Sequence, residues 1–269
     1  MTGGASGIGA ALSRAMVARG DTVVIADIDG EGAQTQAKAL NEQGTGRAWA
    51  TDLDVRDADA VGALVQRVAR EEGRLDVMVN NAGIAVGGEM HELSLAHWDR
   101  VIDINLRGVV HGVHAAFPVM SRQGSGHIVN TASLAGLVPS PLLTPYSATK
   151  HAVVGLSLAL RPEAAAHGVR VTAVCPGFTD TPILDKAGPA DLSKPALAEY
   201  GRELASKAQG GLYSPEALAK DILRGMDRNR GLVVAPRSAR VAWRAVRLAP
   251  GLSNAVGKLE MRYVRRLKA

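Results

Sequence analysis

Several residue types are scarce in this sequence. Cys175 is its only cysteine, and aromatic residues make up 3% of its 269 residues. A single cysteine excludes a disulfide within the chain and agrees with a reducing compartment, so we expect a cytoplasmic location. We find no signal-peptide pattern and no run of about 18 apolar residues, and therefore predict neither secretion nor a membrane span. With 46% hydrophobic residues the chain can still bury a sizeable core, which must be largely aliphatic.

Charge is unevenly distributed along the chain. Residues 237–269 contain nine Lys or Arg and one acid, Glu260, whereas the first 236 residues contain 22 basic and 25 acidic residues. The net charge of +5 therefore conceals a mildly acidic body and a strongly basic tail. We predict one domain over residues 1–236 and a basic helical tail over residues 237–269.

The chain opens with a glycine-rich turn, Thr2-Gly3-Gly4-Ala5-Ser6-Gly7-Ile8-Gly9, followed by an apolar, alanine-rich run. Glycine suits such a turn because a Cβ would keep the backbone away from a bound phosphate. The N-terminus of the following helix offers unpaired N–H groups and the positive end of its dipole, which suit a pyrophosphate. Asp27 ends the next predicted strand, 18 residues after Gly9. An acid at about this distance binds the ribose hydroxyls of NAD and repels the 2′-phosphate of NADP, so we predict dinucleotide binding with NAD preferred.

Only Met1 precedes this turn. A dinucleotide-binding fold needs a buried strand leading into its glycine loop, and that strand lies in the middle of the sheet. Its neighbours would lose hydrogen bonds on both sides. We expect a truncated or mis-set chain start rather than a functional sheet without the strand. In the structure, the two neighbouring strands should flank a gap or a distorted contact.

Short β-branched runs alternate with longer stretches of helical periodicity in the rest of the chain. Strands are predicted over residues 22–26, 47–51, 75–80, 127–131, 170–174 and 232–235, and helices over residues 31–43, 57–72, 97–121, 146–167 and 215–228. Pro162 should bend or interrupt its helix. This alternation predicts an α/β fold with a doubly wound parallel sheet between two layers of helices.

Four residues carry the chemical signal. Tyr146 and Lys150 are four apart on one predicted helix and so share a face. Lowering the pKa of tyrosine by about 3 units takes roughly 4 kcal/mol, which one cation at about 4 Å could supply at an effective dielectric constant near 20. Ser133 follows a strand, where its hydroxyl can bind a substrate oxygen, and Asn105 is a polar residue in an apolar helix. Taken singly, the tyrosine and lysine could be a solvated helix face, Ser133 a turn residue and Asn105 a kink or packing residue.

Taken together, the motifs resemble the short-chain dehydrogenase/reductase family in its single-domain, Rossmann-like form, from Thr2 to about Pro236. The matching residues are Thr2-Gly3-x-x-x-Gly7-x-Gly9, Asp54-Val55, Asn80-Asn81-Ala82-Gly83, Asn105, Ser133, Tyr146-x-x-x-Lys150, and Pro176-Gly177 followed by Thr181. The chain departs from the family pattern at Thr179, where valine is common, and in the absent first strand.

The resemblance implies reversible hydride transfer between NAD(H) and an alcohol or ketone. Tyr146 would be the general acid/base, and Ser133 would orient the substrate oxygen. Lys150 would lower the pKa of Tyr146 and bind the nicotinamide ribose, while Asn105 would hold a water that links Lys150 to solvent.

The resemblance also assigns the cofactor contacts. Besides Tyr146 and Lys150, they are Gly3, Ser6, Gly7, Ile8 and Gly9 in the glycine loop, Asp27 at the ribose, Asp54 and Val55 at the adenine, Asn81, Ala82 and Gly83 along the pocket, and Pro176, Gly177, Thr179 and Thr181 near the nicotinamide. We predict no metal site, because His111 and His114 have no carboxylate or cysteine to complete one.

The resemblance further implies a mobile substrate lid over residues 183–213 and a homodimer or homotetramer paired through residues 97–121 and 146–167. The tail allows a basic amphipathic helix with Leu252, Val256, Leu259 and Tyr263 on one face, which could lie on an anionic membrane or dock on its own or a neighbouring subunit. No nucleic-acid motif accompanies its charge. The alternative to an enzyme is a nucleotide-sensing or membrane-associated binding protein on the same fold. The sequence does not name the substrate.

Overall fold

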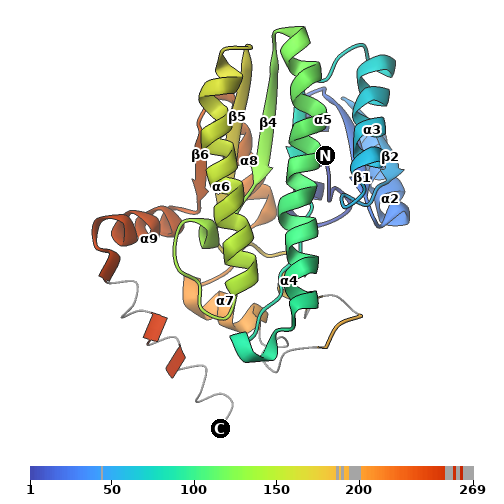
Figure 1. The fold of residues 1–269 in the computed structure, drawn as a ribbon. Helices are drawn as coiled ribbons and strands as arrows, with labels where there is room; N and C mark the ends of the chain where they lie inside the picture. The colour runs from blue at the N-terminus through green and yellow to red at the C-terminus, as the bar shows by residue number, and fades with distance from the viewer. Residues whose placement is uncertain are drawn as a thin grey trace.

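The computed structural model describes residues 1–43, 45–185, 188, 191–193, 201–251, 257–258 and 261–262. Helices and strands alternate along the chain (Figure 1). The strands are β1 (Thr22–Asp27), β2 (Arg47–Asp52), β3 (Val77–Asn80), β4 (Gly126–Thr131), β5 (Val169–Pro176) and β6 (Leu232–Ala235). The helices are α1 (Gly7–Val17), α2 (Gly30–Gln43), α3 (Ala58–Glu71), α4 (Leu95–Ile102), α5 (Gly108–Gln123), α6 (Thr144–Ala165), α7 (Gly201–Gln209), α8 (Pro215–Asp227) and α9 (Arg237–Leu248).

All strand pairs are parallel, but the described strands fall into two sheets. One sheet has the order β1-β2, and the other has the order β3-β4-β5-β6. Between β1 and β3 lie only Met1 and Thr2. Thr2 forms an isolated bridge with Ala26 and donates its N–H to the Val79 carbonyl at 3.0 Å, while the Met1 carbonyl accepts from Ala26 at 2.9 Å. The predicted gap is therefore confirmed, and the two terminal residues span it.

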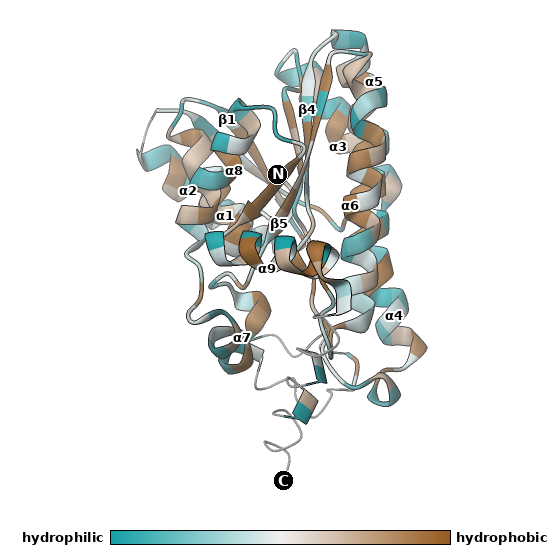
Figure 2. Cartoon of the chain, turned by 90° about the vertical axis from the view of Figure 1, so that its left-hand side faces the viewer, coloured by the Kyte–Doolittle hydropathy of each residue, from teal (hydrophilic) through white to brown (hydrophobic). Residues whose placement is uncertain are grey.

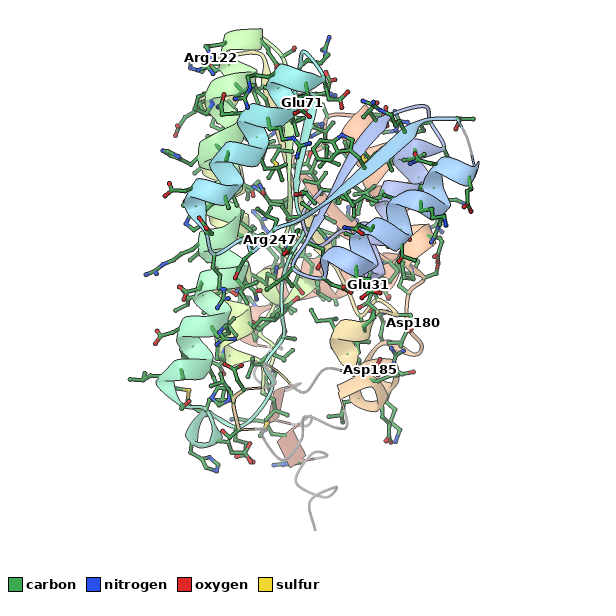
Figure 3. All side chains as sticks on the ribbon, turned by 90° about the vertical axis from the view of Figure 1, so that its right-hand side faces the viewer. Glu31, Glu71, Arg122, Asp180, Asp185 and Arg247 are labelled. Carbon is green, nitrogen blue, oxygen red and sulfur yellow. The ribbon has the colours of Figure 1, made fainter. Side chains whose placement is uncertain are left out.

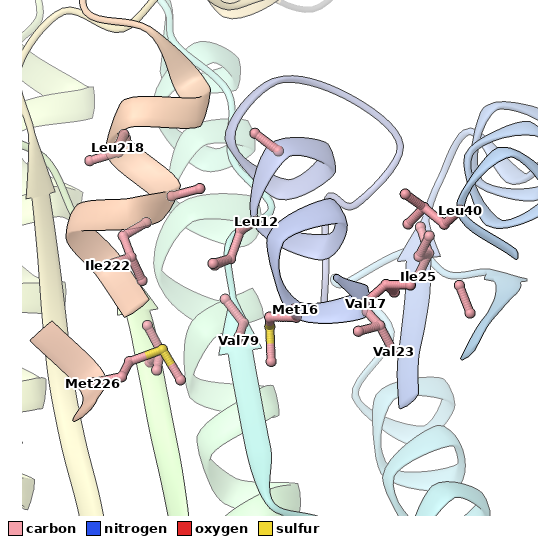
Figure 4. Close-up of a cluster of buried hydrophobic side chains, with 14 of the residues drawn as sticks. Leu12, Met16, Val17, Val23, Ile25, Leu40, Val79, Leu218, Ile222 and Met226 are labelled. Atoms are coloured by element: carbon pink, nitrogen blue, oxygen red, sulfur yellow. The ribbon is translucent and has the colours of Figure 1, made fainter. Parts of the chain in front are cut away.

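Helices cover both faces of these strands, which confirms the predicted three-layer arrangement. On one face, Leu12 of α1 and Ile222 of α8 pack against Val79 and Val129 of the sheet (Figure 4). On the other face, α3, α5 and α6 bury a second cluster that includes Met120 and Ile128. The strands are largely hydrophobic (Figure 2), as expected when both faces are covered, with polar residues such as His127 and Asn130 among them. Each fully buried Leu or Ile stabilises the fold by roughly 1.5–3 kcal/mol.

Charged side chains project from the outer surfaces of the helices. Glu31 on α2, Glu71 on α3 and Arg122 on α5 are all exposed (Figure 3). The apolar stripe of each helix thus faces the strands while its polar stripe faces solvent. This orientation leaves the ends of the strands, rather than their faces, as the place for a ligand site.

Two helices differ from the prediction. The helix expected over residues 97–121 consists of α4, a π-helical segment over Asp103–Arg107 and α5. The helix expected over residues 146–167 is α6, and it continues through Pro162, so of the two predicted effects of this proline, interruption of the helix is wrong. Proline removes one helical hydrogen bond, and the helix around it is held by buried residues such as Ser157 and Ala164.

The C-terminal residues are described only in part. α9 is helical and packs through Ala239 and Trp243 against a core cluster that includes Val234 of β6. The predicted apolar face at Leu252, Val256, Leu259 and Tyr263 lies outside the described residues. No helix of the described chain has the length and hydropathy needed to cross a bilayer.

Candidate active site

The predicted site residues gather at one edge of the sheet. The glycine loop leads into α1, Asn81 follows β3, Ser133 follows β4, and Pro176 ends β5. Because all strand pairs are parallel, these positions lie at the carboxyl ends of the strands, where ligands bind in open α/β sheets.

The glycine loop has the predicted tight geometry. Gly3 and Gly7 have φ angles of 62° and 54°, in the left-handed region. A Cβ on Gly9 would lie 2.0 Å from the Gly3 carbonyl oxygen, so only glycine fits there. Ser6 is the N-cap residue of α1 and makes no side-chain capping hydrogen bond. The first N–H groups of α1, including that of Ile8, therefore donate no capping hydrogen bond to the Ser6 side chain.

Asp27 connects β1 to this loop. Its carboxylate accepts hydrogen bonds from the Ala5 N–H at 2.9 Å and the Asp29 N–H at 3.1 Å. The carboxylate thus fixes the glycine loop against the end of β1, a structural role that its position in the sequence did not reveal. It stays at the place expected for a ribose contact.

The segment after β2 carries Asp54 and Val55. Asp54 is paired with Arg56, which lowers the pKa of the carboxyl group through a side-chain hydrogen bond. The Val55 carbonyl accepts a hydrogen bond from His111 Nδ1 of α5 at 2.9 Å when that nitrogen is protonated. His111 is thus a residue that ties the predicted adenine-contacting segment to α5.

Asn81, Ala82 and Gly83 are held by two side chains. The Thr2 hydroxyl oxygen accepts from the N–H groups of Asn81 and Ala82, at 3.0 and 3.1 Å. Asn105 bonds the backbone of Ile84 through both its amide oxygen and its amide nitrogen, each at 2.9 Å. Asn105 lies within the π-helical turn, a feature that often marks functional sites.

Ser133, Tyr146 and Lys150 come together as predicted. Lys150 is 3% exposed, its Nζ donates to the Thr131 carbonyl at 2.8 Å, and it lies 5.6 Å from the centre of the Tyr146 ring. Burial lowers the pKa of Lys150 to about 8. Burial also raises the pKa of the Tyr146 hydroxyl, and a hydrogen bond with the Ser133 side chain acts in the opposite direction. The lowering of the Tyr146 pKa by Lys150 stays a prediction for the complex with cofactor.

The segment after β5 closes the other side of the site. A Cβ on Gly177 would lie 2.3 Å from Gln209 Oε1, so any other residue there would displace the Gln209 amide. Thr179 and Thr181 are both buried, and Thr179 forms a bridge with Tyr213. The Thr181 methyl group would lie 3.1 Å from a Cβ on Gly7, which places this segment against the glycine loop.

The described part of the predicted lid contacts α4. Arg100 bonds Asp191 through two hydrogen bonds, the shorter 2.7 Å long, and the buried His97 lies 2.9 Å from the Ser193 carbonyl oxygen. These contacts join residues 191–193 to α4, while the role of the segment as a lid stays a prediction. No group of three or more potential metal ligands occurs among the residues that the structure describes.

A family model described as short chain dehydrogenase matches residues 1–191, which is more than half of the chain. The chain belongs to the short-chain dehydrogenase family. Members of this family are oxidoreductases, and the chain is therefore an enzyme that interconverts alcohols and ketones.

Curated relatives and solved structures agree with this assignment. The chain is 44% identical over 224 residues to cis-4-hydroxycyclohexanecarboxylate dehydrogenase of Sinomonas cyclohexanicum, covering 82% of this chain and 86% of the relative. It is 34% identical over 193 residues to D-beta-hydroxybutyrate dehydrogenase of Rhizobium meliloti, covering 70% and 74%. A short-chain dehydrogenase from Burkholderia phymatum in complex with NAD matches with a TM-score of 0.85 and 29% identity, over 94% of this chain and 93% of that one. One from Sphingobium yanoikuyae in complex with NADPH matches with a TM-score of 0.77 and 26% identity, over 93% and 92%.

The residues of this short-chain dehydrogenase fit a nicotinamide dinucleotide. The glycine loop has the conformation that a pyrophosphate needs, and α1 presents its N-terminus there. A Cβ on Gly83 would lie 3.1 Å from Asn105 Oδ1 and 3.5 Å from Lys150 Nζ, so glycine keeps the space beside the lysine open. Membership of the family therefore implies a nicotinamide cofactor, and the glycine loop and the open space beside Lys150 can accommodate it.

Some contributors to the site were missed from the sequence. Thr131 acts through its backbone carbonyl. Because every residue has this group, the residue type does not reveal the role. Thr2 was quoted only as part of the glycine motif, although its hydroxyl organises the Asn81 turn. Gln209 and Arg202 reach the segment after β5 from α7, and only the three-dimensional structure shows this proximity.

Proposed function

We propose that the enzyme is an NAD(H)-preferring alcohol dehydrogenase/ketone reductase in which Tyr146 transfers the proton at the substrate oxygen. The observation that carries this proposal is the grouping of Ser133, Tyr146 and Lys150 at the carboxyl edge of the sheet. When bound, the nicotinamide accepts or donates the hydride. Tyr146 takes the proton from the alcohol during oxidation and returns it to the carbonyl oxygen during reduction, and the Ser133 hydroxyl donates a hydrogen bond to the same oxygen.

Lys150 supports this proton transfer electrostatically. With a pKa of about 8 it carries a positive charge at neutral pH. This charge, together with that of an oxidised nicotinamide ring, favours the phenolate form of Tyr146 and opposes the effect of burial. Asn105 Oδ1 and Lys150 Nζ both lie within about 3.5 Å of where a Cβ on Gly83 would be, which supports the proposed role of Asn105 in holding the water through which the proton reaches solvent.

Replacing Tyr146 by phenylalanine tests the proposal. We expect Tyr146→Phe to lose more than about 100-fold in kcat, because general acid/base catalysis contributes on this scale. NADH affinity should remain nearly unchanged in a calorimetric titration, since only one hydroxyl group is removed. Retained turnover would overturn the role of Tyr146, and loss of NADH binding would show that the hydroxyl serves the cofactor instead.

The proposed preference for NAD(H) rests on Asp27 and Asp29. The Asp27 carboxylate lies at the end of β1 and accepts from the Asp29 N–H, and the Asp29 carboxylate accepts from the Gly32 N–H at the start of α2, so a 2′-phosphate here would add to existing negative charge. We expect NADH to bind at least about tenfold more tightly than NADPH in parallel calorimetric titrations. Asp27→Asn, which removes the charge but keeps an oxygen that can accept from Ala5, should reduce this ratio. Equal affinities in the unaltered enzyme would contradict the preference.

The proposed substrate class is a secondary alcohol that carries a carboxylate. Two relatives that cover most of this chain are named for the oxidation of hydroxycarboxylic acids. The matched test compares cis-4-hydroxycyclohexanecarboxylate and 3-hydroxybutyrate with cyclohexanol and 2-butanol. We expect higher kcat/KM for the acids, and a preference for the neutral alcohols would reject the class.

We propose a homodimer or homotetramer in the cytoplasm, paired through α5 and α6. Val110 on α5 and Leu158 on α6 are large apolar residues that are 39% and 41% exposed.

Peripheral membrane contact through the basic tail also remains a proposal. The tail begins with α9, which carries four arginines and exposes Val241 and Leu248. Hydrophilic and hydrophobic residues alternate along this helix (Figure 2).

A further inference from the structure

One guanidinium group holds the loop that follows β5. Arg202, near the start of α7, donates from Nε and Nη2 to the two carboxylate oxygens of Asp185, at 2.6 and 2.7 Å. Its Nη1 donates to Asp180, and Nη2 also donates to the Thr181 carbonyl at 3.2 Å. Asp180 and Asp185 lie near each other at the lower end of the molecule (Figure 3). A single side chain therefore fixes three positions of this loop.

The loop that Arg202 holds is the one proposed to contact the nicotinamide. Thr181 lies between the two aspartates in the sequence and is 6% exposed. Its side chain packs against Gly7 of the glycine loop, while its carbonyl accepts from Arg202 on the other side. Arg202 therefore fixes Thr181 without lying in the cofactor path itself.

The other end of α7 is attached to the same segment. Gln209 Oε1 accepts from the Phe178 N–H at 2.7 Å, and Gln209 Nε2 donates to the Phe178 carbonyl at 2.8 Å. This amide also occupies the space above Gly177. α7 is thus joined to residues 177–185 at both ends.

α7 has little other burial to hold it in place. Ala205 is the one buried residue in the helix. Exposed ion pairs are individually weak, and Arg202, Asp180 and Asp185 are all more than one-third exposed. Their contribution to global stability is therefore small, whereas their effect on the position of α7 relative to Thr181 is direct.

We propose that Arg202 is a positioning residue that couples dinucleotide binding to the placement of α7 against the segment that follows β5. It acts through Thr181, so the inference rests on the proposed cofactor contact of that residue. When Thr181 is fixed by the dinucleotide, Arg202 transmits its position to α7. Without the guanidinium, Arg202 no longer bonds Thr181 to α7. Dinucleotide binding then no longer affects the position of α7.

Hydrogen exchange of α7 together with NADH calorimetry tests this coupling. In the unaltered enzyme, saturating NADH should slow exchange in the peptide that covers residues 201–209. In Arg202→Ala we expect NADH affinity to fall about five- to tenfold, and the slowing of α7 exchange to be lost even at saturation. Arg202→Lys should restore part of the affinity, because lysine provides a charge but cannot bridge both carboxylates.

Arg74→Ala is the matched control. Arg74 forms an exposed pair with Asp76 next to β3, at the opposite end of that strand from Asn81. It should show unaltered NADH affinity and unaltered α7 exchange. Full NADH affinity with full α7 protection in Arg202→Ala would overturn the proposal, as would equal changes in both arginine variants. An unaltered enzyme that binds neither NADH nor NADPH would instead reject the proposed function, independently of Arg202.

Discussion

Lys150 is a positively charged residue whose burial in the fold disfavours its charged form. It is 3% exposed and its ammonium group makes a hydrogen bond to the Thr131 carbonyl. Burial lowers its pKa from 10.5 to about 8, so that the unfolded chain binds this proton more tightly than the folded protein does. The free energy of unfolding therefore rises as pH increases from about 8 to 10.5, and at neutral pH the buried charge destabilises the fold by about 3 kcal/mol.

Replacing this lysine should separate stability from activity. We expect Lys150→Met to raise the free energy of unfolding at pH 7 by up to about 3 kcal/mol, because an apolar side chain of similar length removes the buried charge. Turnover should be lost. Urea unfolding and kinetic assays measure the two effects, and the exposed Lys220→Met variant should change stability by less than about 0.5 kcal/mol. A less stable Lys150→Met protein would contradict this account of the lysine.

At the residue scale, the site residues that are brought together by their spacing in the sequence could be predicted. Tyr146 and Lys150 lie one helical turn apart, so their meeting follows from helix geometry alone. The position of Ser133 after a parallel strand brings it to the same edge. Thr131 could not be predicted because its carbonyl is common to all residues, and Arg202 could not because its partners lie 17 to 22 positions away in an irregular segment.

Gly112 in α5 and Gly155 in α6 lie in different surroundings. A Cβ on Gly112 in α5 would lie 1.8 Å from Asn80 Oδ1. The Asn80 amide nitrogen donates to Asn130 at 2.8 Å, and Asn130 donates to Ser157 of α6 at 3.0 Å, which forms a buried polar chain across the sheet. Gly155 in α6 is exposed, and a Cβ there would meet no atom within 4 Å.

Substituting alanine for Gly112 and for Gly155 should change the free energy of unfolding in opposite directions. Gly112→Ala should lower the free energy of unfolding by about 1–3 kcal/mol, because the added methyl group displaces the Asn80 amide. Gly155→Ala should raise it by up to about 1 kcal/mol through helix propensity. Denaturant titrations of both variants measure the difference. A change of the same sign in both would show that the helices, and not the contact with Asn80, determine the effect.

At the element scale, the periodicity predicted the order and type of most elements, with bounds within about two residues in most cases. α7 was not predicted, because residues 201–209 lie in a polar segment that the family resemblance assigned to a lid. The π-helical turn at Asp103–Arg107 was not predicted either, and its Asn105 makes long-range bonds to Ile84 that local sequence does not reveal. The helix over residues 146–167 was predicted, and of the two effects expected of Pro162, interruption does not occur.

The whole molecule should lose stability in acid because of His127. This side chain of β4 is fully buried, with Nε2 located 2.8 Å from the hydroxyl of Thr172 on the neighbouring β5. Burial lowers its pKa to about 4, with a smaller contribution from Arg170 and Arg161. The unfolded chain binds the proton more tightly, so the free energy of unfolding falls as pH decreases from about 6.5 to 4, by up to about 3 kcal/mol.

A pH series of urea titrations measures this loss. We expect His127→Phe to flatten the decrease between pH 6.5 and 4, because the variant has no group to protonate there. His91→Phe, which changes an exposed histidine, should leave the decrease unaltered. The same slope in His127→Phe would assign the acid sensitivity to other groups.

The assembly of subunits should depend on the exposed apolar residues of α5 and α6. We expect Leu158→Glu to convert an oligomer to monomers, because a carboxylate would be buried without a partner in a helix-paired interface. Sedimentation at several concentrations measures the change. Leu95→Glu is the control, since Leu95 is 79% exposed and lies on α4. An oligomer that survives Leu158→Glu would place the interface elsewhere.

The division of the sheet between β1 and β3 has a consequence for how ligand binding and unfolding are linked. Asp27 and the glycine loop belong to the side of the two-stranded sheet, whereas Ser133, Tyr146 and Lys150 belong to the four-stranded side. A dinucleotide that contacts both sides would act as a non-covalent cross-link between two cooperative units. By mass action it should raise the free energy needed to separate β1 and β2 from β3. The cofactor would then be a structural member of the sheet as well as a reactant.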